Sequence, residues 1–333
     1  MKGILPVKGV SIAGTFLLTH ITRNLLLIAL CTLCSFGYGQ TSIIDTGIMP
    51  QVFAPGVIST PYSEWSTSFT PDGQTVYSSQ GSIYWTIVFS KRQNGQWMKP
   101  KVASFSGKFR DTDPFVTPDG KKIFFISNRP PKGKPQDKSL QAEHIWYTDH
   151  LPGDAWDTPQ QLDSVINLTG ISNYAPSVSA KGTLFYCSRR KGLTGMQSFY
   201  AAWLGSHYDK PRQLIIPGVS EIQDPFIAPD ESYLVFLSGN DIYISFKQNN
   251  NWGQAQKLGP AVNNGDGNSS PYVSADGKTL YYSSNRMQGF YKRDLKKPAL
   301  NYDELIKENN SLFNSQGNIL MIPIHLPQHT GSK

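Results

Sequence analysis

One sequence unit recurs five times along this 333-residue chain, and each copy has the pattern of two strands joined by a tight turn. In the clearest copy, Asp111–Arg129, a Pro-Phe pair leads into Thr117-Pro118-Asp119-Gly120 and then into an apolar run. The proline fixes φ and the glycine accepts a positive φ, so these four residues favour a turn. The β-branched and aromatic residues on either side favour strands. The turn position of the five copies is occupied by Asp72, Asp119, Lys181, Asp230 and Asp276.

The spacing of the copies indicates the fold class. Neighbouring turn positions lie 46 to 62 residues apart. A full unit continues with an Ile/Tyr/Trp-rich strand and a short strand that begins at or near an aromatic residue. Four strands in a repeat of this length are typical of a β-propeller, because a single blade cannot bury both of its faces and needs neighbours in a closed ring. We therefore predict an all-β propeller of five four-stranded blades, with a six-bladed ring as the alternative.

The two ends of the repeat array complement each other. The fifth unit has a third strand at Asn318–His325 but no fourth strand after it, whereas Gln51–Thr60 precedes the first unit and resembles the end of a repeat. Pairing of these two segments would close the ring and remove its free edges. The predicted propeller domain covers 51–327, with insertions at 130–143 and 287–316 and a tail at 328–333.

The first 39 residues are typical of a secretory signal peptide. Three basic residues are the only charges there, and the apolar run Leu25–Cys34 is followed by a segment with small residues near the expected cut at Gly39. Ten apolar residues are too few to span a bilayer, which needs about 20, so an uncleaved anchor is the less favoured alternative. We expect cleavage near Gly39, a linker at 40–50, export to the periplasm, cell surface or medium, and no stable membrane span in the mature chain.

Composition and motifs narrow the function classes. The net charge falls from +7 to +4 once the three leader charges are removed, and a value this small over the mature chain does not favour a nucleic-acid partner. The sequence has no G-x-S-x-G, H-E-x-x-H or phosphate-binding loop motif, and its histidines lack the spacing of metal ligands. We expect a monomer without cofactor or metal, in which Cys187 is a small buried apolar residue.

Acidic and amide residues recur at two positions of the first strand of each unit. Glu64, Asp111, Asn173 and Asn268 stand eight residues before the turn position, and Asp113 and Asp224 stand six residues before it. Because first strands surround the channel of a propeller, we predict that these six side chains form a polar, partly acidic ligand-binding pocket at one channel mouth. The alternative is that they cap the strand-entry turn by accepting hydrogen bonds from backbone N–H groups.

The recurring unit D-P-F-x-x-P-D-G-K, followed by an aromatic strand and S-N-R, resembles the repeat of the TolB-type propellers, the WD-repeat-like or PD-repeat proteins of bacterial envelopes. The resemblance covers 51–327 and is nearest to the stand-alone secreted form found in the Bacteroidetes. It implies the propeller fold. It does not imply the role of TolB in its envelope system, because TolB has an extra N-terminal domain and six blades.

We predict a non-enzymatic scaffold that binds an envelope protein or a glycan, since the channel and the two insertions offer concave, decorated surfaces on a rigid ring. Basic and aromatic residues of the insertions favour an acidic glycan or a protein as the partner. The alternative is a glycan hydrolase or lyase that uses channel carboxylates such as Asp111, Asp113 and Asp224. Such an enzyme needs two carboxylates roughly 5–10 Å apart.

Overall fold

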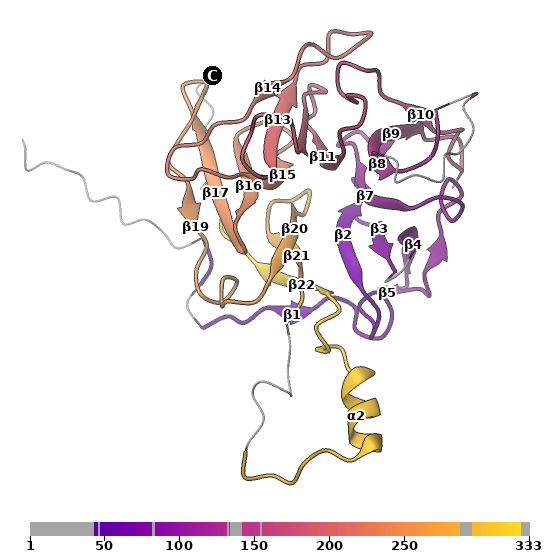
Figure 1. Cartoon of the computed structure of the whole chain (residues 1–333), viewed down its shortest axis with the longest axis vertical. Coiled ribbons are helices and arrows are strands. Elements are labelled where there is room, and N and C mark those ends of the chain that lie inside the picture. The colour runs from indigo at the N-terminus through magenta and orange to yellow at the C-terminus, as the bar shows by residue number, and fades with distance from the viewer. Residues whose placement is uncertain are drawn as a thin grey trace, which may run out of the picture. The chain divides into compact units, whose positions relative to one another are not determined.

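The structure is a computed structural model that describes residues 43–45, 47–81, 84–131, 133, 142–153, 155–286 and 295–327. The predicted leader, the tail and parts of both insertions lie outside the described residues. Five antiparallel sheets stand around one axis, so the five-bladed propeller predicted from the repeat is confirmed (Figure 1). We number the blades 1 to 5 in chain order.

The blades share one order of strands from the channel outward. The inner strands are β2 (Glu64–Phe69), β7 (Asp111–Val116), β11 (Asn173–Val178), β15 (Gln223–Ile227) and β20 (Asn268–Val273). The second strands are β3 (Thr75–Gln80), β8 (Lys122–Ser127), β12 (Leu184–Ser188), β16 (Tyr233–Ser238) and β21 (Thr279–Ser284). The third strands are β4 (Thr86–Gln93), β9 (His144–Asp149), β13 (Gln197–Ala201), β17 (Asp241–Gln248) and β22 (Asn318–Pro323). The outermost strands are short: β5 (Gln96–Trp97), β6 (Lys101–Val102), β10 (Gln160–Gln161), β14 (Arg212–Gln213), β18 (Asn251–Trp252), β19 (Gln256–Lys257) and β1 (Gln51–Val52).

The two ends of the propeller meet in blade 5, as predicted. β1 pairs antiparallel with β22, and Gln51 stands opposite Met321 (Figure 1). The paired strand is shorter than the predicted segment and ends at Val52. Ala54 adopts a left-handed conformation (φ 43°) and Pro55 has no N–H, so neither residue continues the ladder.

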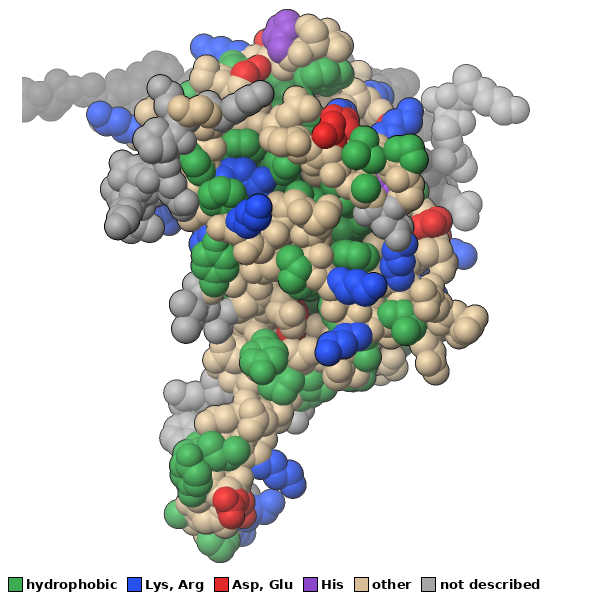
Figure 2. Space-filling model, turned by 90° about the vertical axis from the view of Figure 1, so that its right-hand side faces the viewer, with side chains coloured by type: hydrophobic (Ala, Val, Ile, Leu, Met, Phe, Trp, Pro, Cys, Tyr) green, Lys and Arg blue, Asp and Glu red, His purple; other side chains and the backbone are tan. Residues whose placement is uncertain are grey.

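The insertion at 287–316 contains the one helix of the described chain, α2 (Tyr302–Asn309). Asn301 and Glu304 form a capping box at its start, in which each side chain accepts a hydrogen bond from the backbone N–H of the other residue. No residue of α2 is buried, and the helix extends from the ring with apolar side chains at its surface (Figure 2). Across the described residues no helix has the length and apolar character needed to cross a bilayer.

The repeated turn has the conformation that its sequence predicts. Gly73, Gly120 and Gly277 all have a φ close to +70°. In each of these turns the aspartate before the glycine accepts hydrogen bonds from a hydroxyl two residues earlier and from the backbone N–H two residues later, as Asp72 does from Thr70 and Gln74. The bond from Thr70 and that from the Gln74 backbone hold the pKa of Asp72 below its ordinary value.

The turn glycines give a first testable prediction. A Cβ at Gly73 would meet no atom within 4 Å, whereas a Cβ at Gly120 would lie 3.2 Å from Cδ of Pro71. Gly73→Ala therefore introduces only the cost of a left-handed alanine, about 1 kcal/mol, and Gly120→Ala adds a steric contact of similar cost. Urea denaturation of both variants should show the larger loss of unfolding free energy for Gly120→Ala. Equal losses would contradict this explanation.

Phe53 provides a second prediction, which concerns ring closure. It follows β1, is 4 % exposed, and its ring lies 5.7 Å from Phe69 of blade 1 and 5.1 Å from Tyr281 of blade 5. Phe53→Ala should lower the unfolding free energy by about 3–5 kcal/mol, because it opens a cavity between the first and last blades. Met49→Ala is the matched control, since Met49 lies in the same segment but is 62 % exposed, and it should change stability by less than about 0.5 kcal/mol.

Candidate binding site at the channel mouth

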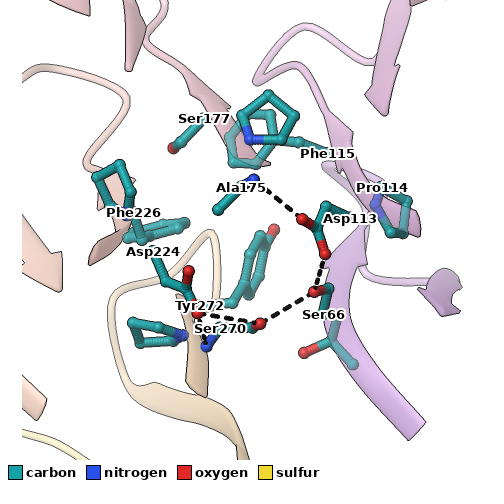
Figure 3. Close-up of a pocket in the computed structure, with 14 residues that line it drawn as sticks. Ser66, Asp113, Pro114, Phe115, Ala175, Ser177, Asp224, Phe226, Ser270 and Tyr272 are labelled. Atoms are coloured by element: carbon teal, nitrogen blue, oxygen red, sulfur yellow. Dashed lines mark hydrogen bonds between the residues drawn. The ribbon is translucent and has the colours of Figure 1, made fainter. Parts of the chain in front are cut away.

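All five inner strands carry a β-bulge at the same place, and the bulge defines the geometry of the channel. The bulge residues are Ser66, Asp113, Ala175, Asp224 and Ser270, all in the left-handed region with φ between 46° and 53°. In four blades the next residue is a proline, which is tolerated at a bulge because it has no N–H to donate to the ladder. The five bulge residues come together at the channel axis (Figure 3).

The backbone N–H of each bulge residue donates a hydrogen bond to the preceding blade around the ring. For three of the bulge residues the acceptor is a side chain on the second strand of the preceding blade. The N–H of Ser66 donates to Ser283 Oγ (3.2 Å), that of Asp113 to Ser79 Oγ (2.9 Å) and that of Asp224 to Cys187 Sγ (3.0 Å). Burial raises the pKa of the Cys187 thiol, so Cys187 remains a neutral thiol that accepts this bond, and nothing in its surroundings activates it as a nucleophile.

In the other two blades that second-strand position is apolar, and an aspartate replaces the missing acceptor. Ile126 and Leu237 occupy the position in blades 2 and 4. Ala175 N donates to Asp113 Oδ2 and Ser270 N donates to Asp224 Oδ2, each at 2.9 Å (Figure 3). The two channel carboxylates thus stand in the two blades that lack a polar second-strand side chain.

The two carboxylates are also part of a hydrogen-bond network across the axis. Ser66 Oγ lies 2.7 Å from Asp113 Oδ1 and 3.0 Å from Ser270 Oγ (Figure 3). Burial, together with the negative charge of Asp113, raises the pKa of Asp224 to about 6. Among the described residues no lysine or arginine forms an ion pair with either carboxylate.

The structure separates the six predicted site residues into two groups. Asp113 and Asp224 face the channel, whereas the four residues two positions earlier are buried and bond to neighbouring groups. Those four are Glu64, Asp111, Asn173 and Asn268, with exposures of 1, 0, 1 and 7 %. They do not form an open ring at the channel mouth. The bulge is the physical reason, because a left-handed residue breaks the alternation that would otherwise put positions two apart on one face.

The four buried residues bond to groups around the start of their inner strands, but among the described residues only Glu64 accepts a backbone N–H bond, as the capping alternative proposed for all four. Asn173 Nδ2 donates to the carbonyl oxygen of Ile166, and Glu64 accepts a hydrogen bond from the backbone N–H of Thr60 at 3.0 Å. Asp111 forms a buried ion pair with Arg129 at 2.7 Å. Burial raises the pKa of Asp111, and the positive charge of Arg129 opposes that shift.

The channel mouth beside the bulges is a cavity of about 340 Å³, which we call the bowl. Asp113 and Asp224 lie at its floor, and its walls include Trp65, Trp85 and Tyr174. The two tryptophan rings meet edge to face with centroids 6.3 Å apart. The residues that line the bowl also include Arg110, Met196, Gln223 and Ser269.

The wall residues were not identified from the sequence, although a signal was present. Trp65, Tyr174, Gln223 and Ser269 occupy one repeat position, seven residues before the turn, and each lines the bowl. The site predicted from the sequence consisted of residues at the two adjacent repeat positions, eight and six residues before the turn. Aromatic residues at this position in two of the five units could have indicated a ligand-facing wall.

Aromatic side chains close the channel below the bowl. Phe69, Phe115, Phe226 and Tyr272 are each 5 to 8 % exposed, and successive rings in the group lie 5.0 to 6.4 Å apart. The cavity between this group and the bulges is about 40 Å³, which is room for about one water molecule. The bowl is therefore a blind pocket rather than the entrance of a pore. Within the described chain no three His, Cys, Asp or Glu residues are placed to hold a metal ion.

Comparisons with known proteins give fold-level likenesses only. No protein-family model matches the sequence, and no curated protein sequence matches it. Similar solved structures include a protein assigned as TolB from Agrobacterium tumefaciens (15 % identity, 68 % of this chain and 71 % of that chain, TM-score 0.44). TolB from Acinetobacter baumannii matches at 15 % identity over 78 % of this chain and 54 % of its own length, with a TM-score of 0.44. A gluconolactonase from Xanthomonas campestris matches at 12 % identity over 86 % of this chain and 98 % of its own, with a TM-score of 0.42.

All three TM-scores are below 0.5, and the chain spans about half the length of the Acinetobacter protein. We therefore carry over no property of these proteins. The fold assignment rests on the strand pairing of this chain.

Glu64 gives a prediction on pH dependence. Burial raises the pKa of Glu64 to about 7, against the opposing hydrogen bonds from Thr60 and Gln80. A folded-state pKa above the ordinary 4.5 means that the protonated form favours folding, so this stability is present below pH 4.5 and is lost as the pH rises through 7. Relative to Glu64→Gln, the wild-type protein should lose about 3 kcal/mol of unfolding free energy over that range.

The measurement is urea denaturation at pH 4.5, 6 and 8, with Asp303→Asn in the exposed helix α2 as the control. The control should follow the wild-type pH profile. A Glu64→Gln profile that also follows the wild type would contradict the assigned shift.

Proposed function

We propose that the protein is an exported, non-enzymatic propeller scaffold that binds an envelope protein or a glycan at the bowl. The observation that carries the proposal is a blind pocket of about 340 Å³ in which aromatic walls surround a fixed polar floor. Ligand pockets have this combination of apolar walls and few, well-placed polar groups. The floor is held by hydrogen bonds between blades, so the site is preorganised before a ligand arrives.

The same geometry favours binding over catalysis. Asp113 and Asp224 each accept a hydrogen bond from the backbone N–H of the next blade, which restricts their movement toward a substrate. Asp111 is buried in its ion pair with Arg129 and does not line the bowl, so the pair of Asp111 and Asp113 does not supply two catalytic carboxylates. A hydrolase or lyase that uses Asp113 and Asp224 is the alternative function.

Export is part of the proposal and is supported by the leader-like composition of residues 1–39. In the mature protein a linker at 40–50 would precede the propeller at 51–327, and the bowl would be accessible in the periplasm, at the cell surface or in the medium. Both insertions, 130–143 and 287–316, would enlarge the surface offered to a partner, including the exposed Tyr302 and Leu305 of α2.

A capture experiment tests the proposed function. Trp85→Ala removes a wall of the bowl, and we expect it to reduce capture of the partner from an envelope extract, or binding on a glycan array, at least tenfold. Tyr62→Ala is the matched control, since Tyr62 is 67 % exposed and does not line the bowl, and it should bind like the wild type. Equal binding by all three proteins would refute the bowl as the site. Turnover of a polysaccharide that disappears in Asp113→Asn would establish the enzymatic alternative instead.

A further inference from the structure

The floor of the bowl carries negative charge that the described protein does not neutralise. Asp113 and Asp224 lie on opposite sides of the channel axis, and among the described residues neither forms an ion pair with a basic side chain (Figure 3). Among the described residues Arg110 is the one basic residue that lines the bowl, and it forms an ion pair with Glu143, which is buried and does not line the bowl. The bowl thus presents two carboxylates to whatever enters it, which favours a cation and opposes an anionic ligand.

A third polar residue of the bowl has a hydroxyl without a hydrogen-bond partner among the described residues. Ser269 is 8 % exposed and lines the bowl, and its buried hydroxyl makes no hydrogen bond to any described residue. A buried hydroxyl without a partner is costly in a free protein, and a ligand that supplies the missing bond recovers that cost. The acceptors that the bowl offers are therefore the two carboxylates, with the buried Ser269 hydroxyl beside them.

The walls determine what kind of cation fits. Trp65, Trp85 and Tyr174 surround the entrance with aromatic surface, and Met196 adds an aliphatic contact. Such walls favour an apolar stem, and aromatic rings attract an organic cation through their negative faces. An alkylammonium group has a compact charge with three N–H donors at the end of an apolar stem, which matches two carboxylates below apolar walls better than a planar guanidinium does.

From these features we propose that the bowl binds a lysine side chain of a partner protein, with the ammonium group between Asp113 and Asp224 and the methylene stem against Trp65 and Trp85. This inference rests on the proposed function and specifies the ligand chemistry of the same site. The acidic floor disfavours an acidic glycan. An amino sugar has the ammonium group but no flexible apolar stem, and it is an outcome of the test below.

The experiment titrates the mature protein with a Gly-Lys-Gly peptide blocked at both ends and follows binding by NMR, which detects millimolar affinities. The same peptide with an acetylated lysine is the first control, because it keeps the stem and removes the charge. We expect binding of the free-lysine peptide and at least tenfold weaker binding of the acetylated one. Equal binding of both peptides would overturn the proposal.

Two variants test the assigned roles. Asp224→Asn keeps an oxygen for the Ser270 N–H and should retain the melting temperature, yet it should weaken peptide binding at least tenfold. Trp85→Ala should weaken it as well, and Tyr62→Ala should leave it unchanged. Unchanged binding by Asp224→Asn would overturn the ammonium site, as would binding of a chitosan oligosaccharide with no binding of the peptide.

The capture experiment separates this inference from the proposed function. If Trp85→Ala abolishes partner capture while Asp224→Asn does not, the bowl is the binding site but its ligand is not a lysine, and only the further inference fails. If neither variant affects capture, the proposed function fails together with the inference. Loss of capture in both variants, with the peptide result above, supports both.

Discussion

The structure depends on one hydrogen bond, repeated five times, from the N–H of a left-handed bulge residue to a side chain of the neighbouring blade. A non-glycine residue with φ near +50° costs of order 1–3 kcal/mol, and an unpaired buried N–H costs a similar amount. The strained conformation persists because the neighbouring blade supplies an acceptor at each of the five interfaces. The bond therefore joins the blades to one another at the place where the five bulge residues meet at the channel axis.

This requirement explains why the channel is acidic. Where the second strand provides Ser79, Cys187 or Ser283, the bulge residue of the same blade is small and uncharged. Where the second strand provides Ile126 or Leu237, the bulge residue is an aspartate. The two carboxylates thus have a structural role that is sufficient reason for their presence. Their charge is nevertheless left without a basic partner among the described residues, and a ligand that enters the bowl interacts with that charge.

The repeat predicted the fold because the turns and strands of each blade are determined by residues close together in the sequence. The turn conformation of Gly120 and the pairing of β1 with β22 follow from residue type, spacing and the missing strand of the last unit. The site was predicted only in part, since Asp113 and Asp224 face the channel but Glu64 and Asp111 do not. The bulge that separates them cannot be predicted from strand periodicity, which assumes a regular alternation of faces. The wall residues Trp65 and Tyr174 were missed for the same reason.

A second compensation between blades, at the repeated turns, shows that the principle extends beyond the bulges. Blade 3 has Lys181 where three other blades have a turn aspartate that accepts a bond from a hydroxyl two residues earlier. Glu231 of blade 4 replaces it, with Oε1 accepting hydrogen bonds from Ser179 (2.9 Å) and Thr183 (2.7 Å). These bonds, together with Lys247, outweigh the effect of burial and hold the pKa of Glu231 below its ordinary value.

Glu231 itself adopts φ 63° where the other turns have glycine. Blade 4 thus tolerates a strained backbone at the residue whose carboxylate stabilises the turn of blade 3. At the bulges, a blade whose second strand lacks the polar residue supplies an aspartate from its own inner strand, and at the turn of blade 3 the neighbouring blade supplies the acceptor. The stabilities of neighbouring blades are therefore coupled, and substitutions at these interfaces should not be additive. A repeat can then lose its consensus residue without loss of the fold, provided that another residue at the interface supplies the missing acceptor. The two carboxylates at the channel floor arise in this way, in the two blades whose second strand is apolar at that position.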